Sequence, residues 1–279
     1  MNIQWYPGHM TKAKRQLAPK MKLIDMVIEV VDARLPLGSQ NPDFEAMFKD
    51  KKKFYILNKS DLADDNITKA WVSYFKAQGN DAKAYSAQRG NPGALMDAIV
   101  KSAEFLTEKY KEKGINKTVR AMIAGIPNVG KSAILNRLSG TRKMKEGNKP
   151  GVTKGLQWAK ITPYFEIMDT PGILMPKIEN EETAAKIAFI GCIKQEILDE
   201  ENLAYYLVKT ISEIKPKVLT ERYKLDEIKD NPYETLCDIC KKRGFLLKGN
   251  EFDIERGART VLDEFKNGKM GKISLEKPQ

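Results

Sequence analysis

Short, nearly continuous runs of apolar residues alternate with longer stretches of helical periodicity over the first two thirds of the 279-residue chain. Such runs are typical of parallel strands that are buried on both faces, so the alternation predicts an α/β fold with a mostly parallel sheet and flanking helices. The strands are expected at 26–31, 54–57, 82–85 and 119–124, with two more on either side of Thr162-Pro163. The helices between them are expected at 66–78, 92–113 and 132–139.

The pattern changes towards both ends of the chain. Residues 11–24 place apolar side chains at helical spacing among basic ones, which predicts an amphipathic basic helix, disturbed near Pro19. Residues 180–266 are mostly helical in period. Strands and helices followed by helices alone predict two domains. We expect an α/β domain over 1–178, which includes the basic N-terminal segment, and an α-helical domain over 179–279.

Composition is that of a soluble globular protein with a basic surplus. Hydrophobic residues make up 42% and charged residues 30%, and no apolar run approaches the ~20 residues that a membrane span needs. Of the net charge of +11, residues 1–179 contribute 30 Lys and Arg against 18 Asp and Glu, whereas residues 180–279 hold 18 against 19. A polyanionic partner is therefore expected, mainly for the first part of the chain.

Three cysteines, Cys192, Cys237 and Cys240, are too few for a disulfide framework, so a reducing compartment fits. The C-x-x-C pair could hold a metal, but a zinc site normally needs a second pair or histidines, and His9 is the only histidine. Helical spacing of small buried residues explains the pair as well. The basic N-terminus could be a transit peptide that is cleaved off. The specific sequence W-Y-P-G-H-M at 5–10 argues against cleavage, because it is unlike that of a segment that is removed.

A phosphate-binding motif, G-x-x-x-x-G-K-S at 125–132, directly follows a predicted strand and precedes a predicted helix. Its glycines let backbone N–H groups turn toward phosphate oxygens, and the helix N-terminus adds a favourable dipole. We expect Lys131 to reach the β- and γ-phosphates and the Ser132 hydroxyl to bind Mg²⁺. A glycine turn with a stray lysine is the alternative. The nucleotide-binding residues expected in this loop are Asn128, Val129, Gly130, Lys131, Ser132 and Ala133.

Two further motifs extend the phosphate site. Asp169-Thr-Pro-Gly172 ends a predicted strand, where Asp169 can bind Mg²⁺ through water and the Gly172 amide can meet the γ-phosphate. Thr153 lies in the polar, basic segment 140–153, which is expected to be a mobile loop, and it is a natural second hydroxyl ligand for Mg²⁺. Taken alone, the first motif could be an ordinary turn and Thr153 a solvated threonine.

A base-reading motif, N-K-S-D, follows the strand predicted at 54–57. The Asp61 carboxylate can accept hydrogen bonds from N1–H and the exocyclic amine of guanine together, and adenine has no such pair of donors. Asn58 can bond the far edge of the base, and the stem of Lys59 can lie along its face. The Ala87 amide is placed to donate to guanine O6. The guanine-binding residues expected are Asn58, Lys59, Ser60, Asp61, Ser86 and Ala87.

The order of these motifs along the chain is rotated. An ordinary small GTPase begins with the phosphate loop and ends with N-K-x-D and S-A, whereas here those two come first. If the last strand–helix units of the sheet are moved to the front, the same loops still meet at one rim. The chain is therefore predicted to bind and hydrolyse GTP. Because both switch regions now lead into the helical domain, we expect the nucleotide-sensing loop to be mechanically tied to it.

The rotated order, together with W-Y-P-G-H-M, D-A-R-L-P, N-K-S-D, G-I-P-N-V-G-K-S, P-G-V-T and D-T-P-G-I-L, resembles the circularly permuted ribosome biogenesis GTPase A (YlqF/RbgA) family over essentially the whole chain. The resemblance implies a cytoplasmic factor that acts late in assembly of the large (50S) ribosomal subunit, binds rRNA and is activated by the pre-ribosome. It also implies that residues 1–178 form a circularly permuted GTPase domain and that the helical domain, 179–279, helps to dock onto RNA. We expect a monomer with no membrane or DNA partner. Ala133 stands where Thr is common in this family, with little effect expected.

The attacking water must be oriented or deprotonated by a group other than the usual glutamine. Many GTPases use a glutamine just after D-x-x-G, but here that residue is Ile173, as is typical of the resembled family. His9 is the candidate, because an imidazole can orient or deprotonate water near neutral pH and the resemblance points to it as well. A turn histidine, or one that contacts RNA, is the alternative. Asn128 suggests a K⁺ site in place of an arginine finger, or else only shapes the loop.

Two other functions stay open at this point. One is a nucleotide-gated regulatory switch that does not act on ribosomes, although no lipidation motif supports a membrane version. The other is a scaffold that holds GTP without useful hydrolysis, since Ile173 replaces the glutamine.

Overall fold

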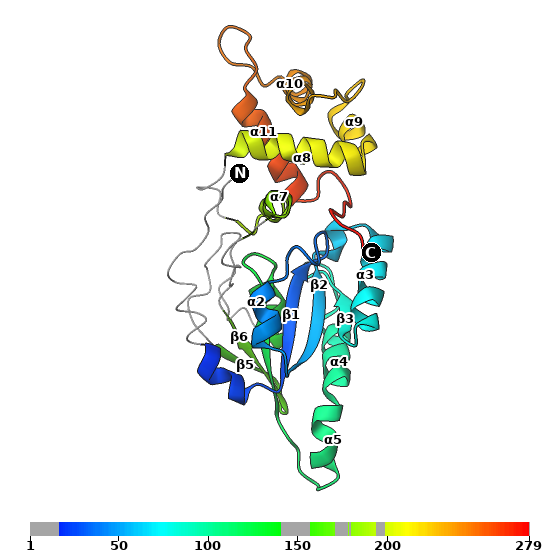
Figure 1. Ribbon diagram of the computed structural model, residues 1–279, viewed down its shortest axis with the longest axis vertical. Helices are drawn as coiled ribbons and strands as arrows, with labels where there is room; N and C mark the ends of the chain where they lie inside the picture. Colours follow the sequence, from blue (N-terminus) through cyan, green and yellow to red (C-terminus); the bar gives the residue numbers. More distant parts are fainter. Residues whose placement is uncertain (1–16, 141–156, 171–177, 179, 194–198, 279) are drawn as a thin grey trace.

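The fold is built on one six-stranded sheet (Figure 1). In the computed structural model, the described residues are 17–140, 157–170, 178, 180–193 and 199–278. The strand order is β3-β2-β1-β4-β6-β5, with all pairs parallel except β5 with β6. The strands are β1 (Met26–Asp32), β2 (Lys52–Asn58), β3 (Asp81–Ala84), β4 (Val119–Ala124), β5 (Gln157–Thr162) and β6 (Phe165–Asp169). The predicted α/β class and mostly parallel sheet are confirmed.

Helices cover both faces of this sheet, which explains the continuous apolar runs. All seven residues of β1 are buried, and alternate residues face opposite layers. Ile28 packs in the core with residues of α4 and α6, whereas Val27 packs with α2 and Val31 with α3. The helices of this part are η1 (Ala18–Leu23), α2 (Pro42–Met47), η2 (Ser60–Leu62), α3 (Asp65–Ala77), α4 (Pro92–Ala103), α5 (Phe105–Lys111) and α6 (Lys131–Ser139).

Three elements differ from the sequence prediction. The helix expected over 92–113 is two helices, because α4 ends at Glu104, whose N–H bonds back three residues to Lys101 instead of four. The short helix α2 was not predicted, since six residues are too few to show a period; Asn41 caps it by accepting from the Asp43 N–H. The described end of the helix expected over 11–24 is the 3₁₀ helix η1 with Pro19 in its first turn.

The C-terminal part is helical, as predicted from its period. Its helices are α7 (Glu181–Phe189), α8 (Glu200–Ile214), α9 (Lys217–Tyr223), α10 (Pro232–Arg243) and α11 (Ile254–Lys266). Helix α10 ends at Gly244 in the left-handed conformation, and it packs against α11, where Gly257 leaves room for the Cys240 sulfur. The buried apolar side chains of these helices form one continuous cluster with those of the sheet. Within the described ranges, no helix is long and apolar enough to cross a membrane.

After α11 the chain returns to the sheet and ends beside α3 (Figure 1). The C-terminal tail, residues 268–276, runs along two loops at the carboxyl ends of β1 and β2. The Ile273 N–H donates to the Leu62 carbonyl at 3.0 Å, and the Leu275 N–H donates to the Arg34 carbonyl at 2.7 Å. Both tail side chains are buried. The tail therefore fastens the helical part to the rim of the sheet.

Candidate nucleotide-binding site

The predicted motif residues that the structure describes converge at one rim of the sheet. Asn58 is the last residue of β2, Asp169 is the last residue of β6, and the phosphate loop starts directly after β4 at Gly125. Ser86 follows the end of β3 by two residues. Because β1, β2, β3, β4 and β6 are parallel, all these loops leave the sheet at its carboxyl edge, which is where open α/β sheets bind ligands.

Close backbone approach explains the glycines of the phosphate loop. Gly130 has φ +100°, and a Cβ there would lie 2.2 Å from Nδ2 of Asn58. At Gly125, with φ +151°, a Cβ would lie 2.5 Å from the Val30 carbonyl oxygen. Any side chain would push the loop away from β1 or β2. Gly130 also begins helix α6, so the free N–H groups of that helix face the loop's interior.

Lys131, Ser132 and Asp169 form a polar cluster at the base of this loop. The Lys131 ammonium group donates to the carbonyls of Gly125 and Ile126 at 3.1 and 3.0 Å. Burial lowers the pKa of Lys131 to about 8, although the nearby carboxylate of Asp169 opposes the shift. The Ser132 hydroxyl lies 3.5 Å from Oδ2 of Asp169.

Asp169 has the properties of a cation ligand. Its side chain is fully buried, and its Oδ1 has no hydrogen-bond partner among the described residues. Burial raises the pKa of this carboxyl group. An unsatisfied carboxylate oxygen beside a hydroxyl is a hard oxygen donor set of the kind that Mg²⁺ prefers, so these two residues fit the predicted magnesium site.

Asn58 joins three loops of the site. Its Nδ2 donates to the Val129 carbonyl at 2.7 Å, and its Oδ1 accepts from the Ala87 N–H at 3.0 Å. The amide that was expected to donate to guanine O6 thus donates to Asn58 here. The Ser60 N–H donates to the Tyr85 carbonyl at 3.1 Å, which ties the N-K-S-D loop to the end of β3.

The phosphate loop also contacts the helical part. Asn128 has φ +62°, and its Nδ2 donates to the Gly191 carbonyl, just beyond α7, at 2.7 Å. Arg34, in the loop after β1, directs Nη1 toward the last carbonyls of α11. Two loops at this rim therefore contact the helical part directly, besides the tail. The nucleotide-sensing loop that follows Asp169 lies outside the described residues, so its expected tie to the helices stays a prediction.

Sequence reasoning gave no role to Asp32 and Arg34. The fully buried Asp32 carboxylate pairs with Arg34 at 2.9 Å and with Lys59 of N-K-S-D at 3.0 Å. Burial alone would raise the pKa of Asp32, but the two cations outweigh it and hold that pKa well below its usual range. The D-A-R run at a strand end was visible, yet only the fold brings it to Lys59.

Four predicted residues, His9, Thr153, Gly172 and Ile173, lie outside the described residues. Their expected roles stay predictions.

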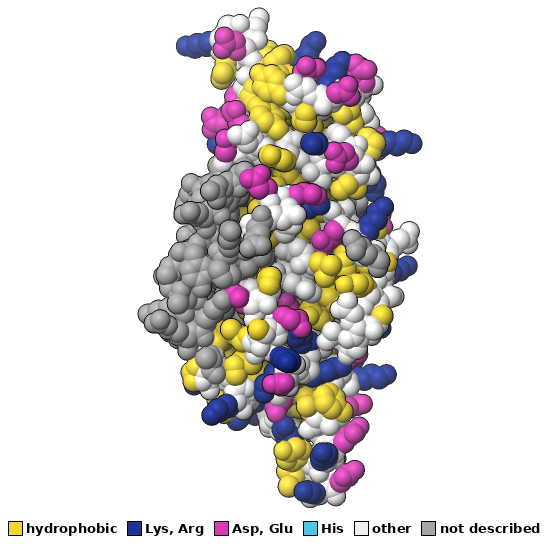
Figure 2. Space-filling model, viewed as in Figure 1, with side chains coloured by type: hydrophobic (Ala, Val, Ile, Leu, Met, Phe, Trp, Pro, Cys, Tyr) yellow, Lys and Arg dark blue, Asp and Glu magenta, His cyan; other side chains and the backbone are white. Residues whose placement is uncertain are grey.

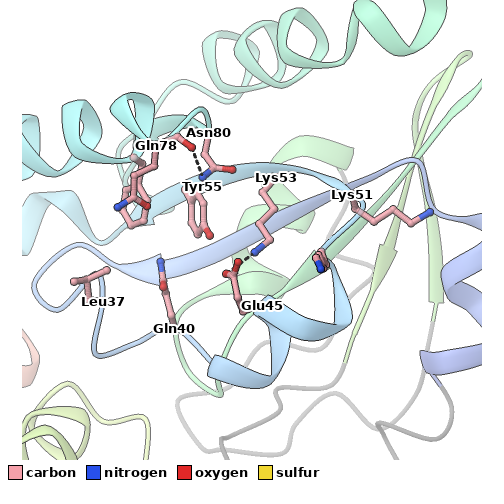
Figure 3. Close-up of a pocket in the computed structure, with 10 residues that line it drawn as sticks. Leu37, Gln40, Glu45, Lys51, Lys53, Tyr55, Gln78 and Asn80 are labelled. Carbon is pink, nitrogen blue, oxygen red and sulfur yellow. Dashed lines mark hydrogen bonds and ion pairs between the residues drawn. The ribbon is translucent and has the colours of Figure 1, made fainter.

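A separate cavity of about 270 Å³ lies away from these motifs (Figure 3). It is enclosed by α2, by β2 and by the C-terminal end of α3. Its lining is Leu37, Gln40, Glu45, Lys49, Lys51, Lys53, Tyr55, Phe75, Gln78 and Asn80. Lys53 and Glu45 pair within it at 2.9 Å. Of the residues predicted to bind nucleotide, none that the structure describes lines this cavity.

The sheet, its loops and their order define a circularly permuted P-loop GTPase with a C-terminal helical region. A family model described as "50S ribosome-binding GTPase" matches residues 120–238. That match starts at the strand before the phosphate loop, and N-K-S-D lies upstream of it.

Relatives match along the whole chain. Ribosome biogenesis GTPase A of Bacillus cereus is 43% identical over 100% of this chain and 95% of its own length. The Thermotoga maritima protein of the same name is 34% identical over 99% and 95%. The structure of GNP-bound YlqF from T. maritima superposes with a TM-score of 0.72 at 30% identity, covering 96% of this chain and 99% of that one. GDP-bound YlqF gives a TM-score of 0.69 at 29% identity. The chain belongs to the ribosome biogenesis GTPase A family and is a GTPase of ribosome biogenesis.

Proposed function

We propose that this GTPase is a late assembly factor for the large (50S) ribosomal subunit, that it binds rRNA in the pre-ribosome, and that the particle stimulates its GTP hydrolysis. The observation that carries the proposal is the direct bond from phosphate-loop Asn128 to Gly191 of the helical part. A particle that holds those helices can act on the nucleotide loops through this contact. The basic surplus of residues 1–179 suits an rRNA partner.

The test is GTP turnover with and without purified large subunits, at two salt concentrations. Strong stimulation that weakens with salt supports an assembly factor, because rRNA binding depends on phosphate neutralisation. Turnover that neither RNA nor ribosomes change would favour a regulatory switch or a scaffold.

Within the site, each motif has a proposed role. Lys131 binds the β- and γ-phosphates, and Ser132 and Asp169 hold Mg²⁺ together with Thr153, while the Gly172 amide senses the γ-phosphate. When bound, Mg²⁺ would supply positive charge to the phosphates. Support comes from the buried Oδ1 of Asp169, which has no hydrogen-bond partner in the part of the chain that the structure describes. The remaining nucleotide-binding residues are Asn58, Lys59, Ser60, Asp61, Ser86, Ala87, Asn128, Val129, Gly130 and Ala133.

His9 is proposed to orient or deprotonate the attacking water, because Ile173 has no hydrogen-bonding group. The test is His9→Ala: GTP binding is expected to persist while ribosome-stimulated turnover falls by about 10²-fold or more. Full stimulated turnover in this variant would remove the idea.

Asn128 is proposed to help bind K⁺, which would supply the positive charge of an arginine finger. Turnover should then be faster in KCl than in NaCl at matched ionic strength. Equal rates in the two salts would count against a potassium site.

The remaining parts of the proposal concern context. We place the protein in the cytoplasm as a monomer, with neither a DNA nor a membrane partner. The division into a GTPase domain, 1–178, and a helical RNA-docking domain, 179–279, is supported by the start of helix α7 at Glu181, after the last strand.

A further inference from the structure

We propose that Asp32 and Arg34 are positioning residues for guanine binding: Asp32 holds the ammonium group of Lys59, and Arg34 ties that arrangement to the end of helix α11. The inference rests on the proposed role of Lys59 along the face of the base.

Asp32, at the end of β1, pairs with two cations. In the sheet it pairs with Asn58, so Lys59 is one residue beyond its cross-strand neighbour. Its Oδ2 lies 3.0 Å from the Lys59 ammonium group and 2.9 Å from Nη2 of Arg34. Its Oδ1 accepts from Nε and from the backbone N–H of Arg34, at 2.9 and 3.1 Å. The carboxylate is 0% exposed, so solvent does not screen these charge-assisted bonds.

Lys59 combines an unusual backbone conformation with a side chain that is held at its end. It adopts φ +58°, a left-handed conformation that is uncommon for a residue other than glycine. The bond to Asp32 fixes the end of the side chain, while 24% of that side chain stays accessible. Holding the ammonium group at a buried carboxylate leaves the apolar stem in one orientation, and a guanine ring can meet that stem without first ordering it.

Arg34 connects this arrangement to the helical part. Its guanidinium is buried and lies 5.3 Å from the ring centroid of Phe265. Nη1 is 3.4 Å from each of the Phe265 and Lys266 carbonyls, at the C-terminal end of α11, where the helix dipole favours a cation. A shift of α11 would therefore move Arg34, its partner Asp32 and the held end of Lys59.

A double-mutant cycle on the full chain tests the positioning role. The Kd of a fluorescent GDP analogue is measured for the original protein, Asp32→Asn, Lys59→Met and the combination. Loss of a charge-assisted bond should raise the Kd about tenfold in Asp32→Asn. If Asp32 acts through Lys59, the combination should bind no more weakly than Lys59→Met alone.

The outcomes separate the two claims. Additive effects, or an effect of Lys59→Met without one of Asp32→Asn, would overturn the inference and leave the role of Lys59 intact. No effect of Lys59→Met would overturn the role of Lys59 and the inference with it. Asp25→Asn is the matched control, since it breaks a carboxylate–lysine pair at 2.6 Å just before β1, at the opposite edge of the sheet, and should leave the Kd unchanged.

Asp32→Asn alone leaves Arg34 buried without a counter-charge and risks misfolding. Asp32→Asn with Arg34→Gln removes both charges together and should show the same loss of GDP affinity in a protein whose circular dichroism is unchanged. Arg34→Lys tests the link to α11, because lysine cannot reach Asp32 and the helix carbonyls together. GDP should slow amide hydrogen exchange over 261–270 in the original protein and not in Arg34→Lys; equal protection in both would overturn the link.

Discussion

Two buried polar residues show how a single side chain can stabilise or destabilise this sheet. Asn58 is 1% exposed, and both ends of its amide are bonded to loops of the nucleotide site. Glu29, in the middle of β1, is 2% exposed, and burial raises its pKa to about 7 despite the nearby Lys53 and a hydrogen bond with Tyr55. Asn58 therefore stabilises the site at any pH, whereas the contribution of Glu29 depends on its proton.

Asn58→Asp is expected to lower the free energy of unfolding by about 2 kcal/mol or more. Aspartate can still accept from the Ala87 N–H, but it cannot donate to the Val129 carbonyl and places a negative oxygen against it. Urea unfolding measures the change. The matched control is Asn91→Asp at the start of α4, where the side chain only accepts and aspartate keeps both bonds. Equal stability of the two variants would contradict the bridging role of Asn58.

Glu29→Gln is expected to stabilise the protein at pH 8 by up to about 3 kcal/mol. The folded chain holds the Glu29 proton up to about pH 7, whereas the unfolded chain releases it near 4.5, so stability falls as pH rises through this window. The advantage of glutamine should therefore shrink towards pH 5. Urea unfolding between pH 5 and 8 checks this, with exposed Glu213→Gln as the control. A gain that does not change with pH would point to packing instead.

At the scale of elements, the C-terminal tail links parts that are far apart in the sequence. Besides the bonds of Ile273 and Leu275, the Ser274 hydroxyl accepts from the Asp64 N–H at 3.1 Å. The Glu276 carbonyl accepts from the indole N–H of Trp71 at 3.4 Å, and its carboxylate accepts from the Leu37 N–H. The tail thus bonds to the loop that follows Asp32 and to the loop that follows Lys59.

Removing residues 272–279 is expected to lower the free energy of unfolding by about 3–5 kcal/mol, because two fully buried apolar side chains are lost with the tail bonds. Trp71, 0% exposed in the intact chain, should shift its fluorescence to longer wavelength. Removing only residues 277–279 leaves every named contact in place and serves as the control. Equal melting temperatures of both truncated chains would show that the tail does not stabilise the rim.

The elements also show what the sequence could and could not predict. The strands were predictable because β1, β2 and β4 are buried on both faces and read as apolar runs. The rim positions of Asn58, Lys131 and Asp169 were predictable because Asn58 and Asp169 end strands and the loop that leads to Lys131 follows β4. The tail was not, since its bonds span more than 200 residues and leave no local period. The pairing of Asp32 with Lys59 also leaves no local pattern in the sequence, because the register of β1 and β2 brings the two residues together.

At the scale of the whole molecule, the positive charge is concentrated in two segments. Residues 1–16 and 141–156 together hold 8 Lys and Arg against one Glu, a surplus of +7 out of the total of +11. Elsewhere the charges are nearly balanced, and on the face seen in Figure 2 basic and acidic side chains are interspersed from end to end. In α10, Lys242 pairs with Asp226 and Arg243 with Glu264, so these cations already have partners.

The proposed rRNA contact should therefore depend on the basic segment 141–156 more than on α10. The affinity for large-subunit rRNA is measured against salt for two variants that each lose three charges: Arg142→Gln/Lys143→Gln/Lys145→Gln and Lys241→Gln/Lys242→Gln/Arg243→Gln. Each phosphate contact contributes about 0.7–0.9 to the slope of log K against log salt, so the first variant should lose up to about 2–3 of that slope. The second should lose little, because Lys242 and Arg243 already pair with carboxylates and so neutralise fewer RNA phosphates on binding. If the α10 variant loses the larger slope, the helical part and not the segment after α6 carries the phosphate contacts.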